Sequence, residues 1–171
     1  MFESQGGYAV GVLVQTNFGG DLTISGIPVG RELQSIDSEN TGDGSCMIVI
    51  ATDAPITYRN LRRLAKRATF GLARTGGNCS NGSGEYVIAL STAKELRIPY
   101  QRGGSFLLQN NELRNDRMTP LFEAVIEATE EAIYNSLITA KITIGKNGIT
   151  VEALPLEKTL KILKNYNQLN E

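Results

Sequence analysis

Residues 46–51, of sequence CMIVIA, constrain the fold more than any other segment of this chain. The run is short, continuous and apolar, which is typical of a β-strand that is covered on both of its faces. Other strands must pair with it, and other elements must pack against it. The rest of the sequence is therefore interpreted around a central buried strand.

The neighbouring segments predict an α+β fold in which strands and helices share one core. Strands are expected at 8–15, at 85–90 and, as a short returning strand, at 21–24. Helices are expected at 57–74, at about 119–142, where Thr119 caps the helix and Pro120 lies in its first turn, and at 156–166. The polar stretches 31–44 and 94–117 are expected to be surface loops.

The chain contains no histidine. A Ser-His-Asp triad, a Cys-His pair and a histidine-ligated zinc site are therefore excluded. Hydrolytic chemistry would need another base, such as a carboxylate, a lysine or an α-amino group. The cysteines, Cys46 and Cys79, match no zinc-binding spacing. We expect two reduced thiols in a cytoplasmic protein, although their pairing in one disulfide stays open, and we expect no metal and no cofactor.

Charge and hydropathy argue against several classes of partner. The formal net charge is -1, so the chain has no bulk attraction to nucleic acid or to an anionic membrane. It has no apolar run near the ~18 residues of a membrane helix, and its first residues lack the pattern of a signal peptide. The arginines within 57–74 leave anion or nucleic-acid binding as a weaker interpretation, because no aromatic residues are interleaved with them.

The first candidate site is the Gly44–Ser45 bond, between an acidic loop and the apolar run. A serine hydroxyl is a poor nucleophile without a base. Cleavage of this bond would give Ser45 a free α-amine, whose reference pKa of ~7.7 to 8.0 suits a base near neutral pH. One residue would then supply both nucleophile and base. The simpler interpretation, which composition alone favours, is a turn that leads into a strand.

Two further candidates are weaker when taken alone. The segment 81–85, of sequence NGSGE, places Ser83 and Glu85 in a glycine-rich connection, and no P-loop lysine follows it. Asn17 follows the first predicted strand, where a carboxamide can donate to an oxyanion. The alternatives are an ordinary loop at 81–85 and turn chemistry at Asn17.

Taken together, these segments resemble one family. The motifs are GDGSCMIVIATDAP at 42–55, NLRRLAKRATFGLARTGG at 60–77, NGSGEYVIALSTA at 81–93 and VGVLVQTNFG at 10–19. They are similar to the DmpA-type aminopeptidases of peptidase family S58, which include L-aminopeptidase/D-esterases and β-peptidyl aminopeptidases. The similarity spans nearly the whole chain, with the motifs in the family's order.

The resemblance implies an αββα sandwich of the DmpA/ornithine acetyltransferase type and one structural domain. Residues 1–44 would be the end of the α-chain region with its acidic processing loop, and 45–171 the catalytic β-chain region. Family precursors are longer than this chain, so the sandwich is expected to be incomplete, with most of the α chain missing.

The resemblance also implies roles for the candidate residues. Self-cleavage between Gly44 and Ser45 would expose Ser45 as nucleophile, Ser83 and Glu85 would bond around it, and Asn17 would donate to the oxyanion. The implied protein is an autoprocessing serine aminopeptidase that needs no cofactor and acts on short peptides, amides or esters. Its expected partners are copies of itself and a separate α-chain fragment. The alternative is a catalytically silent, uncleaved, oligomerising domain of the same fold.

Overall fold

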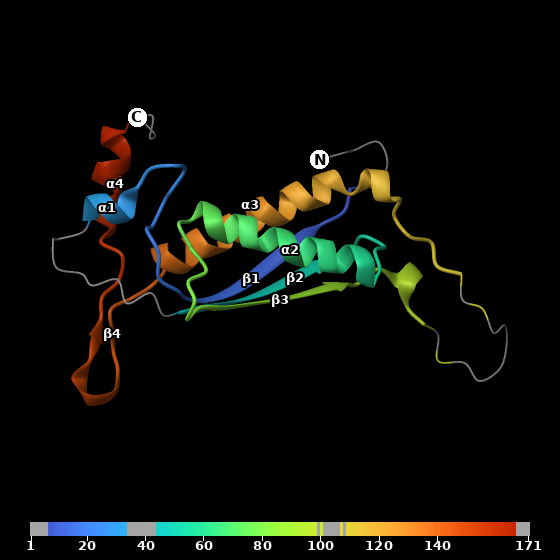
Figure 1. Ribbon diagram of the computed structural model, residues 1–171, viewed down its shortest axis with the longest axis horizontal. Helices are drawn as coiled ribbons and strands as arrows, with labels where there is room; N and C mark the ends of the chain where they lie inside the picture. The colour runs from blue at the N-terminus through green and yellow to red at the C-terminus, as the bar shows by residue number, and fades with distance from the viewer. Residues whose placement is uncertain (1–6, 34–43, 99, 101–106, 108, 167–171) are drawn as a thin grey trace.

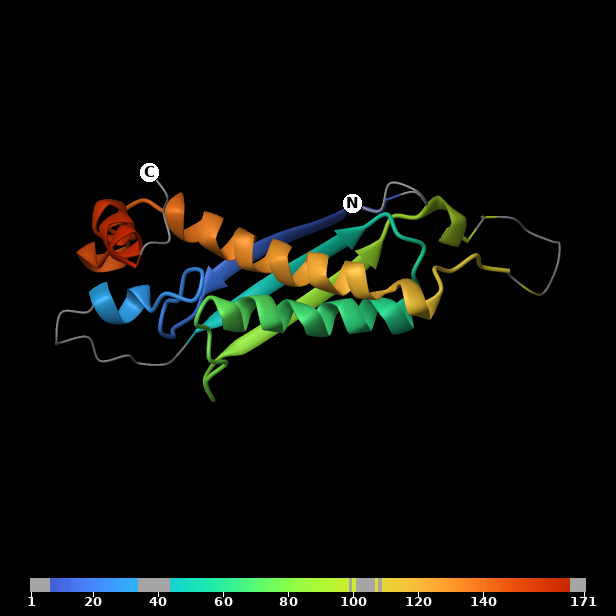
Figure 2. The same ribbon diagram turned by 90° about the horizontal axis from the view of Figure 1, so that it is seen from above.

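The computed structural model describes residues 7–33, 44–98, 100, 107 and 109–166 of the 171-residue chain. A three-stranded sheet is covered on one face by two long helices, which run side by side along it (Figures 1 and 2). The strands are β1 (Val10–Asn17), β2 (Ser45–Thr52) and β3 (Gly84–Ser91). The helices are α2 (Tyr58–Arg74) and α3 (Thr119–Ile138). The α+β fold class is confirmed.

The order of the strands is β1-β2-β3, with β1 antiparallel and β3 parallel to the central strand. Asn17 pairs with Ser45, and Ser45 pairs with Gly84. The end of β1 therefore meets the starts of β2 and β3 at one edge of the sheet. This register brings three segments that are distant in the sequence to the same place.

The core lies between β2 and the two helices. Alternate side chains of β2 are fully buried, and they form one cluster with apolar residues of α2 and α3. The cluster includes Ile48, Ile50, Leu64, Leu72, Val125 and Ile133. The two helices cover only this face of the sheet. The side chains of β2 therefore alternate between buried positions on the helix side and less buried positions on the other side.

The opposite face of the sheet is uncovered in the part of the chain that is described. Leu13 is 70% exposed, Tyr86 64% and Ile88 55%. Met47 on the central strand is also exposed. The expectation that residues 46–51 are covered on both faces is therefore wrong for these residues, because no described element packs on the second face. The second layer expected for a complete sandwich is not among the described residues.

Two expectations near the N-terminus are corrected. The strand expected at 21–24 is replaced by isolated bridges, one of Gly20 with Gly77 just before it and one of Ile24 with Ile27, because a tight turn with Ser25 at φ 50° reverses the chain. A short helix, α1 (Val29–Leu33), replaces part of the expected loop at 31–44. The remainder of that loop, 34–43, lies outside the described residues.

The C-terminal half needs smaller corrections. Helix α3 ends at Ile138 rather than near 142, and a small hairpin of β4 (Thr143–Ile144) and β5 (Thr150–Val151) follows it. Met118 occupies the N-cap position, so Thr119 is the first helical residue. The expected final helix is confirmed as α4 (Leu156–Asn165), which packs against α1 at one end of the molecule (Figure 1).

The described part of 94–117 contains only short 3-10 turns, at Lys94–Leu96 and Asn115–Arg117, so the expected irregular surface segment is confirmed there. None of the helices in the described ranges has both the length and the apolar character needed to cross a bilayer.

Candidate active site

The Gly44–Ser45 peptide bond lies at the first rung of the β2–β3 ladder. The Ser45 hydroxyl donates to the Gly44 carbonyl oxygen at 2.7 Å, and the Gly84 N–H donates to the same oxygen at 3.1 Å. Two donors on one carbonyl oxygen withdraw electron density from its carbon. The Gly44 carbonyl group, which the Ser45 hydroxyl would attack in self-cleavage, is therefore fixed in position and polarised.

The Cα atom of Gly44 lies so close to the end of β1 that a residue with a side chain does not fit at this position. A methyl group on its Cα would lie 2.5 Å from the Asn17 carbonyl oxygen and 2.5 Å from the Phe18 Cα. Real carbon atoms do not approach backbone so closely. The close approach of the neighbouring strand is therefore a physical reason for glycine at position 44.

Asn17 and Ser45 lie on the same, uncovered face of the sheet. They are directly paired in the antiparallel register, and side chains of such pairs project to the same side. The exposed Asn17 side chain and the half-buried Ser45 hydroxyl are thus neighbours at the sheet edge. A carbonyl group that approached Ser45 from this face would also meet the carboxamide.

Ser83 and Glu85 are bonded to each other, with the Ser83 hydroxyl donating to the Glu85 carboxylate. Glu85 pairs with the buried Cys46, so it lies on the helix-covered side, whereas Ser45 lies on the open side. Among the described hydrogen bonds, none joins Ser45 to Ser83 or Glu85. The structure therefore brings all four predicted residues to one edge of the sheet, but on its two faces.

Two thiols, those of Cys46 and Cys79, lie near the Glu85 carboxylate, an arrangement that no local sequence pattern predicts. Burial, with smaller contributions from Glu85 and Cys79, raises the pKa of Cys46 to about 11. Burial, and then the nearby Glu85 carboxylate, raise the pKa of Cys79. Both cysteines are free, and a protonated thiol is a poor nucleophile. Only the strand register, which pairs Cys46 with Glu85, reveals this cluster.

The loops that carry Asn17 and Ser83 are joined by backbone hydrogen bonds. Asp21 N–H donates to the Gly76 carbonyl at 3.2 Å, and Thr23 N–H donates to the Thr75 carbonyl at 3.0 Å. Tyr134 of α3 bonds the same turn through the Thr23 carbonyl, and burial raises the pKa of Tyr134 to about 12. These contacts fix the site edge against the helical layer.

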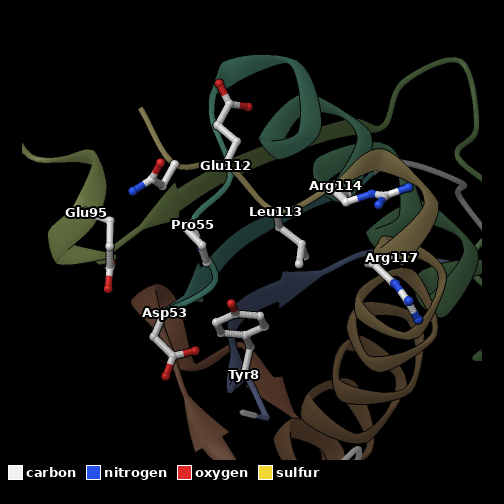
Figure 3. Close-up of a pocket in the computed structure, with 9 residues that line it drawn as sticks. Tyr8, Asp53, Pro55, Glu95, Glu112, Leu113, Arg114 and Arg117 are labelled. Carbon is white, nitrogen blue, oxygen red and sulfur yellow. The ribbon is translucent and has the colours of Figure 1, made fainter. Parts of the chain in front are cut away.

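A depression of about 590 Å³ lies at the other end of the sheet (Figure 3). Tyr8, Asp53, Glu112 and Arg117 are among the residues that line it, and none of the predicted site residues does. We therefore do not assign the chemistry to this depression. No group of three or more metal-binding side chains occurs within the described ranges.

Comparisons with known proteins agree with one another. The sequence model of Peptidase family S58 matches residues 1–151. A β-peptidyl aminopeptidase (BapA) of Sphingosinicella microcystinivorans is 42% identical over 179 residues, covering 95% of this chain and 44% of its own length. The chain thus spans less than half the length of this relative.

Solved structures give the same result. The PH0078 protein from Pyrococcus horikoshii OT3 has a TM-score of 0.84 and 45% identity, over 95% of this chain and 44% of that one. The L-aminopeptidase D-Ala-esterase/amidase from Ochrobactrum anthropi, described as a prototype serine aminopeptidase with a variant Ntn-hydrolase fold, has a TM-score of 0.76 and 27% identity. It is matched over 95% of this chain and 49% of its own.

Proposed function

This chain belongs to peptidase family S58, and from that membership we propose that it is a serine aminopeptidase that cleaves its own Gly44–Ser45 bond. The observation that carries the proposal is the Gly44 carbonyl oxygen, which accepts hydrogen bonds from both the Ser45 hydroxyl and the Gly84 N–H. The absence of histidine supports a nucleophile that provides its own base.

Self-cleavage proceeds as an acyl shift. The Ser45 hydroxyl oxygen attacks the Gly44 carbonyl carbon, and the Gly84 N–H stabilises the negative charge that develops on the oxygen. The C–N bond breaks, the amine takes up the hydroxyl proton, and an ester joins Gly44 to the Ser45 oxygen. Water then hydrolyses the ester, which frees the Gly44 carboxylate and the Ser45 hydroxyl.

In the cleaved protein, the neutral α-amine of Ser45 accepts the proton of its own hydroxyl during attack on a substrate acyl group. Asn17 donates to the oxyanion, because its carboxamide is on the same face as Ser45. Ser83 and Glu85 orient the Ser45 amine from the helix-covered face of the sheet. The acyl ester on Ser45 is finally hydrolysed, which fits short peptides, amides or esters as substrates.

The part of the uncovered sheet face around Leu13, Ile88 and Leu90 is the docking surface for the remainder of the sandwich, which none of the described residues supplies. Its support is the length of the relatives, of which the chain spans 44%, and the apolar side chains Leu13, Ile88 and Leu90 on this face. The remainder is the α-chain part, either on a separate fragment or on a longer polypeptide. We also propose that the protein is a homo-oligomer and that it is located in the cytoplasm, where its two free thiols would stay reduced.

Intact-mass measurement after incubation of the purified chain tests self-cleavage. We expect two fragments that meet at Gly44 and Ser45, none with Ser45→Ala, and continued cleavage with Ser45→Cys, since a thiol is also a nucleophile. The original chain and the Ser45→Cys variant should also hydrolyse an amino-acid p-nitroanilide, and the Ser45→Ala variant should not. A single stable chain that behaves as Ser45→Ala does would favour the silent, uncleaved domain.

A further inference from the structure

The aromatic ring of Tyr86 lies beside the candidate nucleophile on the uncovered face of the sheet. A methyl group placed on Gly84 would lie 3.0 Å from Cε2 of Tyr86 and 3.5 Å from Oγ of Ser45. The ring therefore folds back along β3 over Gly84, toward the Ser45 hydroxyl. The absence of a side chain at position 84 provides the space that the ring occupies.

The surroundings of Ser45 differ on its two sides. On the β1 side lie the amides of Asn17, which pairs with Ser45, and Gln15, which pairs with Met47. On the β3 side lies Tyr86, whose β2 partner is also Met47. A group that bonds to Ser45 from the open face thus has hydrogen-bonding side chains on one flank and an apolar wall on the other.

This face of the sheet carries no charged side chain among the strand residues. Its positions, which alternate with those facing the helices, are Gly11, Leu13, Gln15, Asn17, Ser45, Met47, Val49, Ala51, Gly84, Tyr86, Ile88 and Leu90. A charged substrate side chain would lose water here without gaining an ion pair. An apolar side chain would lose only its unfavourable contact with water.

We propose that Tyr86 is a specificity-determining residue, whose ring forms the wall of the subsite for the side chain of the substrate's N-terminal residue. Together with Met47 it selects apolar, and above all aromatic, side chains over small or charged ones. The inference rests on the proposed function, because it takes Ser45 as the nucleophile. Aromatic contacts of this kind change affinity by about two- to tenfold.

Ligand binding to the full chain labelled with 3-fluorotyrosine tests the inference. The chain has six tyrosines, and the fluorine resonance that Tyr86→Phe removes is that of Tyr86. The probes are L-phenylalaninol, L-alaninol and L-lysinol, which carry a free amine but no cleavable bond. We expect phenylalaninol to shift the Tyr86 resonance and to bind about five- to tenfold more tightly than the other two.

Tyr86→Ala should weaken phenylalaninol binding about five- to tenfold, whereas Tyr86→Phe should retain it because the ring and not the hydroxyl is the wall. Tyr58→Ala is the matched control, since Tyr58 is 73% exposed on the helical layer. Equal affinity for the three probes, no shift at Tyr86, or an equal effect of Tyr58→Ala would overturn the inference. Intact-mass measurement of the same samples reports self-cleavage separately, so the two failures are distinguishable.

Discussion

At the scale of single residues, the backbone around the 44–45 bond explains which side chains the site tolerates. Gly44 touches the end of β1, and its carbonyl is the first acceptor of the β2–β3 ladder. A bond held from two sides has little freedom to rotate away from the Ser45 hydroxyl, which lies 2.7 Å from the carbonyl oxygen. Small displacements of the reacting atoms slow a reaction strongly, so substitutions at position 44 should slow self-cleavage.

Gly44→Ala should slow self-cleavage at least about tenfold and destabilise the fold by about 1–3 kcal/mol, because the new methyl group meets backbone atoms of Asn17 and Phe18 at 2.5 Å. The measurements are the half-time of cleavage by mass spectrometry and urea unfolding. Gly11→Ala is the control, since a methyl group there meets nothing within 4 Å. Equal behaviour of the two variants would contradict the close-approach argument.

The two thiols should differ in reactivity although both have raised pKa values. Cys46 is fully buried with a pKa of about 11, so at pH 8 about one part in a thousand is thiolate, whereas Cys79 is exposed. Iodoacetamide should therefore modify Cys79 first in the folded protein and both residues in urea. Peptide mapping over time measures this order.

The pH dependence of the unfolding free energy provides a check on Cys46. Its folded pKa is higher than the ordinary 9.0, so the stabilising contribution is complete below pH 9 and is lost as the pH rises toward 11. In the iodoacetamide experiment, faster alkylation of Cys46 than of Cys79 at pH 8 would show that the cluster around Glu85 is arranged differently.

At the scale of elements, the sequence predicts the parts with strong periodicity. The apolar run at 46–51 and the amphipathic patterns at 57–74 and 156–166 gave strands and helices close to those of the structure, because burial of one stripe or one run decides them. The strand predicted at 21–24 does not form, because a tight turn reverses the chain at Ser25 and the N–H groups of Asp21 and Thr23 donate to residues 75–76. No local pattern encodes such partners. The helix α1 is too short for periodicity to detect.

The contact between α2 and α3 depends on Gly71. A methyl group there would lie 2.5 Å from the Ile126 carbonyl oxygen and 2.7 Å from the Thr129 Cβ. Helix propensity alone predicts that Gly71→Ala stabilises by about 1 kcal/mol. Overpacking of the helix crossing predicts a net loss of about 1–3 kcal/mol.

Urea unfolding of Gly71→Ala distinguishes these two effects by the sign of the change, and we expect destabilisation. Ala73→Gly on the exposed side of the same helix is the control, with an expected loss of about 1 kcal/mol from propensity alone. A more stable Gly71→Ala protein would mean that the helices can separate at little cost.

At the scale of the whole molecule, the candidate site is a product of strand register. The sequence supplied Asn17, Ser45, Ser83 and Glu85 as candidates, and the register brings them to one edge of the sheet. Their division between two faces, the position of Tyr86 and the thiols around Glu85 depend on pairing between segments about 30 to 40 residues apart. Local composition cannot fix such pairing, so these features appear only in the folded chain.

The same register leaves an apolar face with no described layer upon it, and this makes a prediction for the 171-residue chain. The chain should bind the dye ANS and self-associate, because exposed apolar patches of this kind are sites of association. Replacing Leu13 and Ile88 together by threonine, which keeps strand propensity, should lower dye fluorescence by about half. Self-association should fall with it, as measured by sedimentation velocity.

The matched control replaces Ile144 and Ile149, which are as exposed but belong to the β4–β5 hairpin and its turn. If exposed apolar area alone decides association, both double variants act alike, and the sheet face has no special role. If the face is where the remainder of the sandwich packs, the row of Leu13, Val49 and Ile88, which pair across the three strands, dominates, and only the first variant loses about half of the dye fluorescence. Tyr86 stays in place in both variants, so phenylalaninol binding should survive the loss of dye binding. The substrate subsite and the docking surface would then be separate parts of one sheet face.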